Sequence, residues 1–184
     1  MATDQQAFER LVLPHLDAAY NLARWLSGNE HTAADVVQEA FLRAMRFFDT
    51  FRGTDARPWL LKIVRNSYHT LRSRDRNRAM VHWDDEAAFN DVAADVSCDP
   101  QAALIRAADV ESVRRAIQQL PDDYREVLVL REMEGLAYKE IADVVNSPIG
   151  TVMSRLSRGR QRLAQILGRE HGPAAATAER GGAP

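Results

Sequence analysis

Apolar side chains recur every three or four positions along most of the chain, which is the spacing of helices that bury one face. The first such segment runs from Phe8 to Leu26, and the short run Ser27-Gly28-Asn29 ends it. Pro14 lies inside this segment. Because proline lacks an amide proton, we expect it to kink the helix or to divide it in two.

Two more helices are predicted in the first 80 residues. Thr32 is followed three residues later by Asp35, and this pair is a start signal for a helix that continues to about Phe48. Pro58 opens a third amphipathic segment that continues to about Arg74, since proline is favoured in the first turn of a helix.

The second half of the chain has the same periodicity. Residues 103–119 predict an amphipathic helix, and residues 122–134 predict another, whose first-turn acids complement the helix dipole. Gly135 is expected to end that helix. Signals for β-strands are nearly absent, so the predicted fold class is all-α.

The 184 residues suffice for two small helical domains, each with a modest core. Residues 81–102 lack a clear period and are acidic, which predicts a flexible acidic linker. The predicted organisation is a first domain of residues 1–80, this linker, a second domain of residues 103–170 and a disordered tail of residues 171–184.

The segment from Tyr138 to Arg160 predicts a helix-turn-helix, whose second helix lies in the DNA major groove. Ser147 is expected to cap that second helix, and Pro148 to occupy its first position. One face of both helices is apolar and is expected to pack on the core: Ile141, Ala142, Val145, Ile149, Val152, Leu156 and Leu163.

Four polar residues of the second helix are expected to point outward: Thr151, Ser154, Arg155 and Arg158. Short hydroxyl side chains near the helix start permit close approach to base edges, and arginines reach guanine or phosphate oxygens. We interpret this surface as DNA-binding, against the alternative of an ordinary helical hairpin with a solvated basic face.

The net charge of −2 conceals a strong segregation of charge. Residues 57–78 contain seven basic side chains against Asp75 alone, and residues 81–100 contain six acids and no lysine or arginine. Residues 149–162 then contain four arginines and no acid. Two basic patches on either side of an acidic strip predict two modules that bind polyanions.

The first domain has two polar faces of interest. Arg65, Asn66, His69 and Arg72 share one helix face near the aromatic run Phe47, Phe48 and Phe51, of which at least one or two are expected to be core. Cations beside aromatic and amide groups suit single-stranded DNA, which needs both phosphate and base contacts. Asp35, Gln38, Glu39 and Arg43 form a second face, which by pattern alone is a solvated face with one weak ion pair.

No catalytic, metal or cofactor site is predicted. The nine glycines form no phosphate-binding loop, and the five histidines have no ligand spacing. Cys98 is the only cysteine, which excludes an intrachain disulfide. The chain has neither an apolar run of membrane-spanning length nor the pattern of a signal peptide, so a cytoplasmic binding protein is expected.

Four segments together resemble the extracytoplasmic-function (ECF) class of bacterial RNA polymerase sigma factors: DVVQEAFLRAMRFF (35–48), FRGTDARPWLLKIVRNSYHTLRSR (51–74), LPDDYREVLVLREMEGLAYKEIA (120–142) and SPIGTVMSRLSRGRQRL (147–163). This resemblance covers most of residues 8–168. It implies a sigma region-two domain, a sigma region-four domain, and a role in transcription initiation without a cofactor.

The resemblance also implies roles for individual residues. Asp35, Gln38 and Glu39 would contact the β′ clamp helices of core RNA polymerase, which replaces the solvated-face interpretation. Residues for the melted minus-ten element would be Arg52, Arg65, Asn66, His69 and Arg72. Thr151, Ser154, Arg155 and Arg158 would read the minus-thirty-five element, while the second domain also holds the β flap. An anti-sigma factor is an expected partner.

Two other functions are compatible with a helix-turn-helix. A one-component transcriptional regulator would form a stable homodimer and bind duplex DNA tightly without polymerase, but it leaves the basic residues 57–78 unexplained. A decoy that sequesters regulators would bind its partner equally well after Arg155 and Arg158 are changed to alanine.

Overall fold

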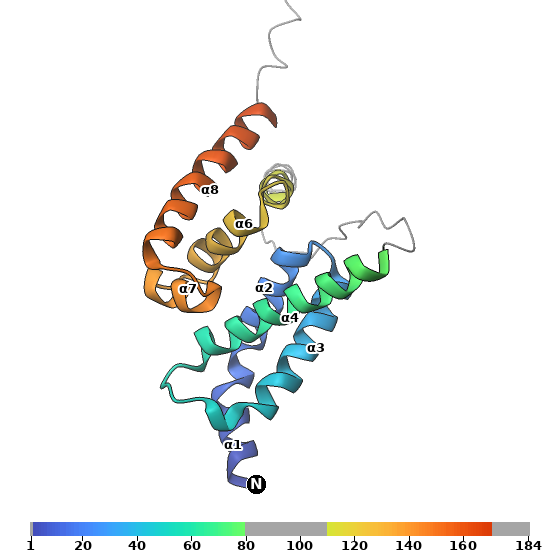
Figure 1. The fold of residues 1–184 in the computed structure, drawn as a ribbon, viewed down its shortest axis with the longest axis vertical. Coiled ribbons are helices and arrows are strands. Elements are labelled where there is room, and N and C mark those ends of the chain that lie inside the picture. Colours follow the sequence, from blue (N-terminus) through green and yellow to red (C-terminus); the bar gives the residue numbers. More distant parts are fainter. Residues whose placement is uncertain (1, 80–109, 171–184) are drawn as a thin grey trace, which may run out of the picture.

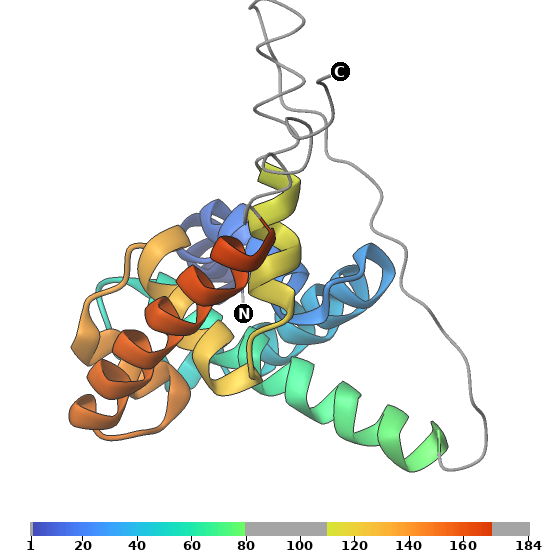
Figure 2. The same ribbon diagram turned by 90° about the horizontal axis from the view of Figure 1, so that it is seen from above.

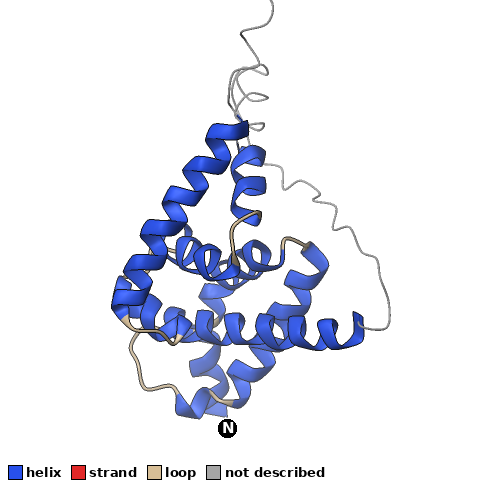
Figure 3. Ribbon diagram, turned by 45° about the horizontal axis from the view of Figure 1, so that its top comes forward, coloured by secondary structure: helices blue, strands red, loops and turns tan. Residues whose placement is uncertain are grey.

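The computed structural model describes residues 2–79 and 110–170, and all regular structure in these two ranges is helical (Figures 1 and 3). The all-α prediction is therefore confirmed. The predicted acidic linker, Cys98 and the predicted tail lie outside the described residues.

Proline divides the first helical segment, as predicted. Helix α1 (Ala2–Leu11) is followed by a 3-10 turn, η1 (Leu13–His15), which contains Pro14, and then by α2 (Leu16–Ser27). Gly28 ends α2 in the left-handed conformation, with φ of 71°, where glycine has no steric cost.

Helix α3 (Glu30–Arg46) begins two residues before Thr32, so the predicted start was wrong. Asn29 is the N-cap, because its backbone is extended and its Oδ1 accepts the Thr32 N–H at 3.1 Å. The helix also ends before Phe48, which instead begins a 3-10 turn, η2 (Phe48–Thr50).

Helix α4 (Ala56–Ala79) is longer at both ends than Pro58 and Arg74 predict. It starts earlier because the Asp55 carboxylate accepts the Arg57 N–H at 2.9 Å and thereby caps the first turn. Pro58 then lies in that first turn, where a missing N–H leaves no helical hydrogen bond unmade.

The second half contains four helical segments. Residues 110–118 are helical. Helix α6 (Asp122–Leu128) continues into a π-helical turn, η3 (Val129–Met133), and Gly135 ends this unit with φ of 65°, as predicted. Helices α7 (Tyr138–Val145) and α8 (Ile149–Glu170) follow.

Each half contributes its own set of buried apolar side chains to one continuous core. Helices α2, α3 and α4 pack on one another and bury Leu22, Val36, Leu60, Leu61 and Val64. Helices α6, α7 and α8 bury Val127, Leu130, Ile141, Val152 and Leu156. Seen from above, the C-terminal end of α4 extends away from the second group, while α6 and residues 110–118 lie close to the first (Figure 2).

Helix α8 approaches α6 closely at Gly159. A Cβ atom there would lie 3.0 Å from Leu128 Cδ1 and 3.3 Å from Tyr124 Cβ. The absence of a side chain at this position therefore sets the separation of the two helices.

Leu60→Ala is expected to lower the free energy of unfolding by about 2–5 kcal/mol, because it leaves a cavity in the core of the first half. Leu60 is fully buried, whereas Leu42 on α3 is 57% exposed, so Leu42→Ala is the matched control and should cost less than about 0.5 kcal/mol. Urea unfolding of both variants, followed by circular dichroism, measures the difference. Equal losses would contradict the assignment of this core.

Candidate nucleic-acid interface

Helices α7 and α8 form the predicted helix-turn-helix. Asn146 ends α7 in the left-handed conformation, with φ of 52°, and the chain then turns into α8. Ser147 is not the cap that the sequence predicts. Helix α8 begins only at Ile149, the Pro148 carbonyl accepts its first amide protons, and the Ser147 hydroxyl instead lies 3.5 Å from the Val145 carbonyl.

Four of the seven residues of the predicted apolar stripe are buried, Ala142 and Leu163 are half-buried, and Ile149 is exposed. Val152 and Leu156 of α8 and Ile141 and Val145 of α7 are buried. Ile149 is 48% exposed, so its assignment to the core was wrong. It is the first residue of α8, ahead of the part of the helix that packs on its neighbours.

The predicted outward face of α8 is accessible only in part. Ser154 and Arg158 are exposed, and Thr151 is half-buried. Arg155 is already engaged, since its Nη2 lies 2.7 Å from Asp123 Oδ2. Met153 adds an exposed apolar side chain to the same half of the helix, which suits contact with a thymine methyl group.

Helix α7 has half of a capping box. Glu140 accepts the Ala137 N–H at 2.6 Å, but alanine has no side-chain oxygen to accept a proton in return. Ala137 has the extended backbone of an N-cap, with φ of −69° and ψ of 154°.

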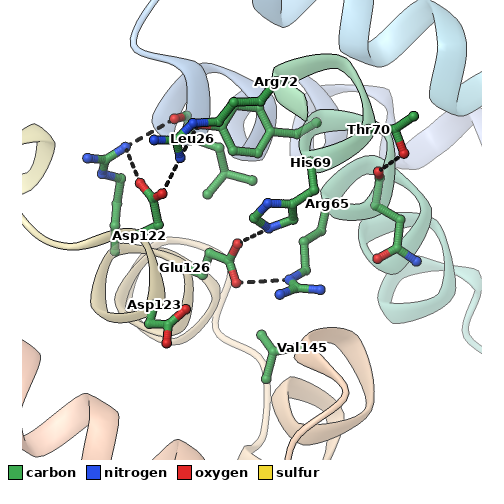
Figure 4. Close-up of polar contacts among 12 residues, drawn as sticks. Leu26, Arg65, His69, Thr70, Arg72, Asp122, Asp123, Glu126 and Val145 are labelled. Carbon is green, nitrogen blue, oxygen red and sulfur yellow. Dashed lines mark hydrogen bonds and ion pairs between the residues drawn. The ribbon is translucent and has the colours of Figure 1, made fainter. Parts of the chain in front are cut away.

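The basic face of α4 is the largest departure from the sequence-based prediction. Arg65 and His69 both contact the carboxylate of Glu126 on α6 (Figure 4). The distance from Arg65 Nε to Glu126 Oε2 is 2.9 Å, and His69 Nε2 contacts the other carboxylate oxygen. The side chain of Glu126 is only 2% exposed, so this contact is buried.

Burial alone would raise the pKa of Glu126, because it disfavours the charged form. The hydrogen bond from His69 and the charge of Arg65 outweigh burial, and they hold the pKa of Glu126 below its ordinary value. The carboxylate is therefore ionised at neutral pH and depends on partners from the other half of the chain.

Two further pairs extend this contact along α4. Arg72 pairs with Asp122 and also donates to the hydroxyl of Tyr68 at 3.3 Å. At the other end of the helix, Arg57 Nη2 lies 2.6 Å from Glu134 Oε2, and the Glu134 side chain is only 4% exposed. Burial raises the pKa of Tyr68, so its hydroxyl stays protonated.

Asn66 and Arg52 remain exposed. Arg52 donates to the backbone carbonyls of Asp49 and Phe51 and so braces the loop that leads into α4. Phe48 and Phe51 stack on each other and contact the Trp59 ring edge-on and at a tilt, whereas Phe47 is exposed. At least one or two of the three phenylalanines were expected to be core, whereas Phe48 and Phe51 are half-buried and pack against the core.

The second polar face of the first domain lies on α3. Asp35 and Gln38 are exposed, and Glu39 forms the predicted pair with Arg43 at 2.7 Å. Leu42 and Met45 continue the same side of the helix and are also exposed. A cleft of about 600 Å³ opens at the end of α3, lined by Gln5, Phe8, Met45, Arg46, Phe48, Asp49 and Arg52.

The sequence-based reasoning missed the acids Asp122, Glu126 and Glu134 as partners of α4. Asp122 was assigned to the helix dipole of its own helix. The sequence does indicate that Glu126 needs a partner, because it lies next to the run Val127–Leu130, in which every residue is buried. A charge beside such a run requires a cation, but the pattern does not say which one.

Within residues 2–79 and 110–170, no cluster of metal-ligating side chains is present. None of the helices in those ranges combines the length and the apolar character needed to cross a membrane.

Family models match both halves of the chain. The model for Sigma-70 region 2 matches residues 11–78, and the model for Sigma-70 region 4 matches residues 111–163. The chain is 37% identical over 169 residues to the RNA polymerase sigma-H factor of Pseudomonas aeruginosa, covering 89% of this chain and 88% of that protein. The chain belongs to the ECF family of RNA polymerase sigma factors.

Other relatives agree with this assignment. The ECF sigma factor SigW of Bacillus subtilis is 33% identical, covering 89% of this chain and 90% of that protein. The ECF sigma-E factor of Escherichia coli is 34% identical, covering 87% of this chain and 86% of that protein.

Two solved structures resemble this sigma factor in fold. The sigma factor RpoE in complex with the anti-sigma factor NepR, from Bartonella quintana, has a TM-score of 0.72 and 30% identity, covering 88% of this chain and 97% of that one. CnrH in complex with the cytosolic domain of CnrY has a TM-score of 0.63 and 28% identity, covering 90% of each chain.

Ala137→Ser is expected to raise the free energy of unfolding by about 0.5–2 kcal/mol, because the new hydroxyl completes the capping box with Glu140. Thermal unfolding measures the change. Ala164→Ser, at an exposed interior position of α8, is the control and should be slightly destabilising. A loss of stability in both variants would show that Ala137 is not a working N-cap.

Proposed function

We propose that this sigma factor binds core RNA polymerase and directs promoter recognition, promoter melting and transcription initiation. The observation that carries the proposal is the match of both sigma regions, in order, to the two helical halves of the structure. The factor supplies specificity by binding and performs no catalysis itself.

The proposed domains keep the bounds that the sequence suggests. Residues 1–80 act as region two and residues 103–170 as region four, with residues 81–102 as the connection and residues 171–184 as a tail. The family matches at residues 11–78 and 111–163 fall inside the first and third of these ranges.

The polymerase-binding surface lies on α3 and is formed by Asp35, Gln38 and Glu39, which engage the β′ clamp helices. The exposure of Asp35 and Gln38 supports this assignment. Exposed Leu42 and Met45 adjoin them and add apolar area of the kind that stabilises protein interfaces. Region four holds the β flap in the same complex.

The proposed surface for the melted minus-ten element consists of Arg52, Arg65, Asn66, His69 and Arg72. The cationic side chains neutralise phosphates, and the exposed Asn66 amide offers donors and an acceptor to the edge of an unstacked base. Trapping such bases drives strand separation without nucleotide hydrolysis.

The proposed surface for the duplex minus-thirty-five element is the N-terminal half of α8, with Thr151, Ser154, Arg155 and Arg158. Its position as the second helix of a helix-turn-helix supports major-groove binding. Arg155 must leave Asp123 in order to contact DNA.

An anti-sigma factor is the proposed regulator, and the cytoplasm is the proposed location. Support comes from the fold similarity to RpoE and CnrH, each of which was solved in a complex, the first with an anti-sigma factor.

Run-off transcription with purified core polymerase tests the proposal. Transcripts that start at a defined promoter should appear only when this chain is added. A one-component regulator would instead bind its duplex site tightly without polymerase, and core polymerase would start transcription no differently in its presence.

Replacing Gln38 and Glu39 together by alanine is expected to weaken assembly with core polymerase by about tenfold, because interface contacts of this kind each cost about 1 kcal/mol or more when removed. The matched control is Gln5→Ala/Glu9→Ala, which removes the same residue types from an exposed pair on α1. Fluorescence anisotropy of labelled sigma measures both affinities. Equal weakening would contradict the assigned surface.

Asn66→Ala and Arg158→Ala are expected to separate melting from duplex binding. Asn66→Ala should reduce permanganate reactivity of the minus-ten element by about tenfold with little change in closed-complex affinity, since a base contact is worth about 1–3 kcal/mol. Arg158→Ala should weaken the closed complex instead. Asn21→Ala, at an exposed site on α2, is the control for Asn66. Equal effects of Asn66→Ala on both steps would contradict base capture.

A further inference from the structure

The outward face of α8 differs from the one that the sequence pattern predicts. Fully exposed residues recur in pairs, one helical turn apart, at positions 149–150, 153–154 and 157–158, and these six residues form an exposed ridge. Thr151 and Arg155 lie beside the exposed ridge and are half-buried. The centre of the ridge is therefore formed by Met153 and Ser154, and Met153 is 53% exposed.

An apolar pair forms the N-terminal part of the exposed ridge. Ile149 is 48% exposed and lies four residues before Met153, so the two side chains are neighbours on the helix surface. Beside them, a Cβ atom at Gly150 would meet no described residue from another part of the chain within 4 Å. A flat surface can therefore approach the backbone of α8 closely at this point.

Two polar side chains of α8 are less free to contact bases than their position in the sequence suggests. The Ser154 hydroxyl donates to the Thr151 carbonyl at 2.9 Å. Arg155 pairs with Asp123. Bases in the major groove are distinguished by hydrogen bonds or by apolar contact with the thymine methyl group. The apolar pair can make the second kind of contact without giving up an existing one.

The surroundings of the apolar pair favour DNA over a protein partner. Residues 149–162 contain four arginines and no acid, and Arg158 is exposed one turn beyond Ser154. Phosphates flank the base edges on both sides of the major groove, so an apolar centre with cationic surroundings matches that groove in charge. In a helix-turn-helix, the N-terminal residues of the second helix contact base edges, and Ile149 and Met153 lie in that part of α8.

We propose that Met153, with Ile149 beside it, reads the C5-methyl group of a thymine in the minus-thirty-five element and thereby sets a preference for an A·T pair. The proposal rests on the function proposed above. Cytosine lacks this methyl group, whereas 5-methylcytosine carries it, so the same contact makes binding sensitive to cytosine methylation at that position. Loss of the contact costs about fourfold in affinity, which corresponds to one buried methyl group.

The test uses holoenzyme formed from the full chain and core polymerase, on a duplex promoter that supports run-off transcription. Each thymine of the minus-thirty-five element is replaced singly by deoxyuridine, which lacks only the methyl group. Closed-complex affinity is measured by fluorescence anisotropy at low temperature, where the strands stay paired. The native holoenzyme should lose about fourfold in affinity at one position or at two neighbouring positions. An element in which no thymine is sensitive overturns the proposal.

Substitution of Met153 shows whether this side chain makes the contact. Met153→Ala should weaken binding to the thymine duplex by about fourfold and leave binding to the deoxyuridine duplex nearly unchanged, because protein and base then lack the same contact. Met153→Leu keeps an apolar side chain and should keep the discrimination. With cytosine in place of the sensitive thymine, addition of a C5-methyl group should tighten binding by the native chain about fourfold.

Met133→Ala is the matched control, because Met133 is 45% exposed and lies in η3, outside the helix-turn-helix. It should leave the discrimination against deoxyuridine at its native value. If Met153→Ala weakens both duplexes equally, or weakens assembly with polymerase instead, the contact with the methyl group is disproved. Equal effects of the two alanine variants lead to the same conclusion.

The proposed function and this contact can fail separately. If the chain supports no run-off transcription, the same comparison is made without polymerase, on duplexes that the full chain selects from a random-sequence library. Discrimination against deoxyuridine that depends on Met153 would then disprove the proposed function and leave the methyl contact standing. Failure to select any duplex would disprove both.

Discussion

The buried carboxylate of Glu126 is the constraint on which the described arrangement depends. A charged group removed from water requires compensation, and Glu126 receives it from Arg65 and His69, more than fifty residues earlier in the chain. The buried apolar residues of both halves belong to one cluster, and α7 packs on α4 beside this contact. The relative position of the two halves therefore depends on charge pairing as well as on apolar burial.

Arg125 links the two halves through hydrogen bonds to backbone carbonyl groups. Its guanidinium donates to the carbonyls of Gln118 and Leu120 in its own half and to that of Leu26 in the other. One fully ionised side chain thus satisfies helix-end carbonyls on both sides of the contact. Burial lowers the pKa of Arg125, but the neighbouring Asp122 opposes that shift, and the group stays charged.

The sequence predicted the structural features that depend on residues close to one another along the chain. Apolar spacing identified the helices, and the stops at Gly28 and Gly135 and the division at Pro14 follow from backbone chemistry alone. The start of α3 was missed because Asn29 and Thr32 are both good caps, and only the extended backbone of Asn29 decides between them. The partners of Arg65 and Arg72 were missed for a different reason. Periodicity shows which face a side chain occupies, but it does not show which distant segment covers that face.

The chemistry of the contact matches that of the DNA contact proposed for the same face of α4. An apolar interface would expose hydrophobic area on opening, and that cost would have to be met by the new partner. Ion pairs between half-exposed arginines and carboxylates can be exchanged for arginine–phosphate pairs with little change in the number of charges that are paired. The cations of the proposed minus-ten surface are therefore also suited to hold the second half of the chain, and screening by salt weakens ion pairs with carboxylates and with phosphates in the same direction.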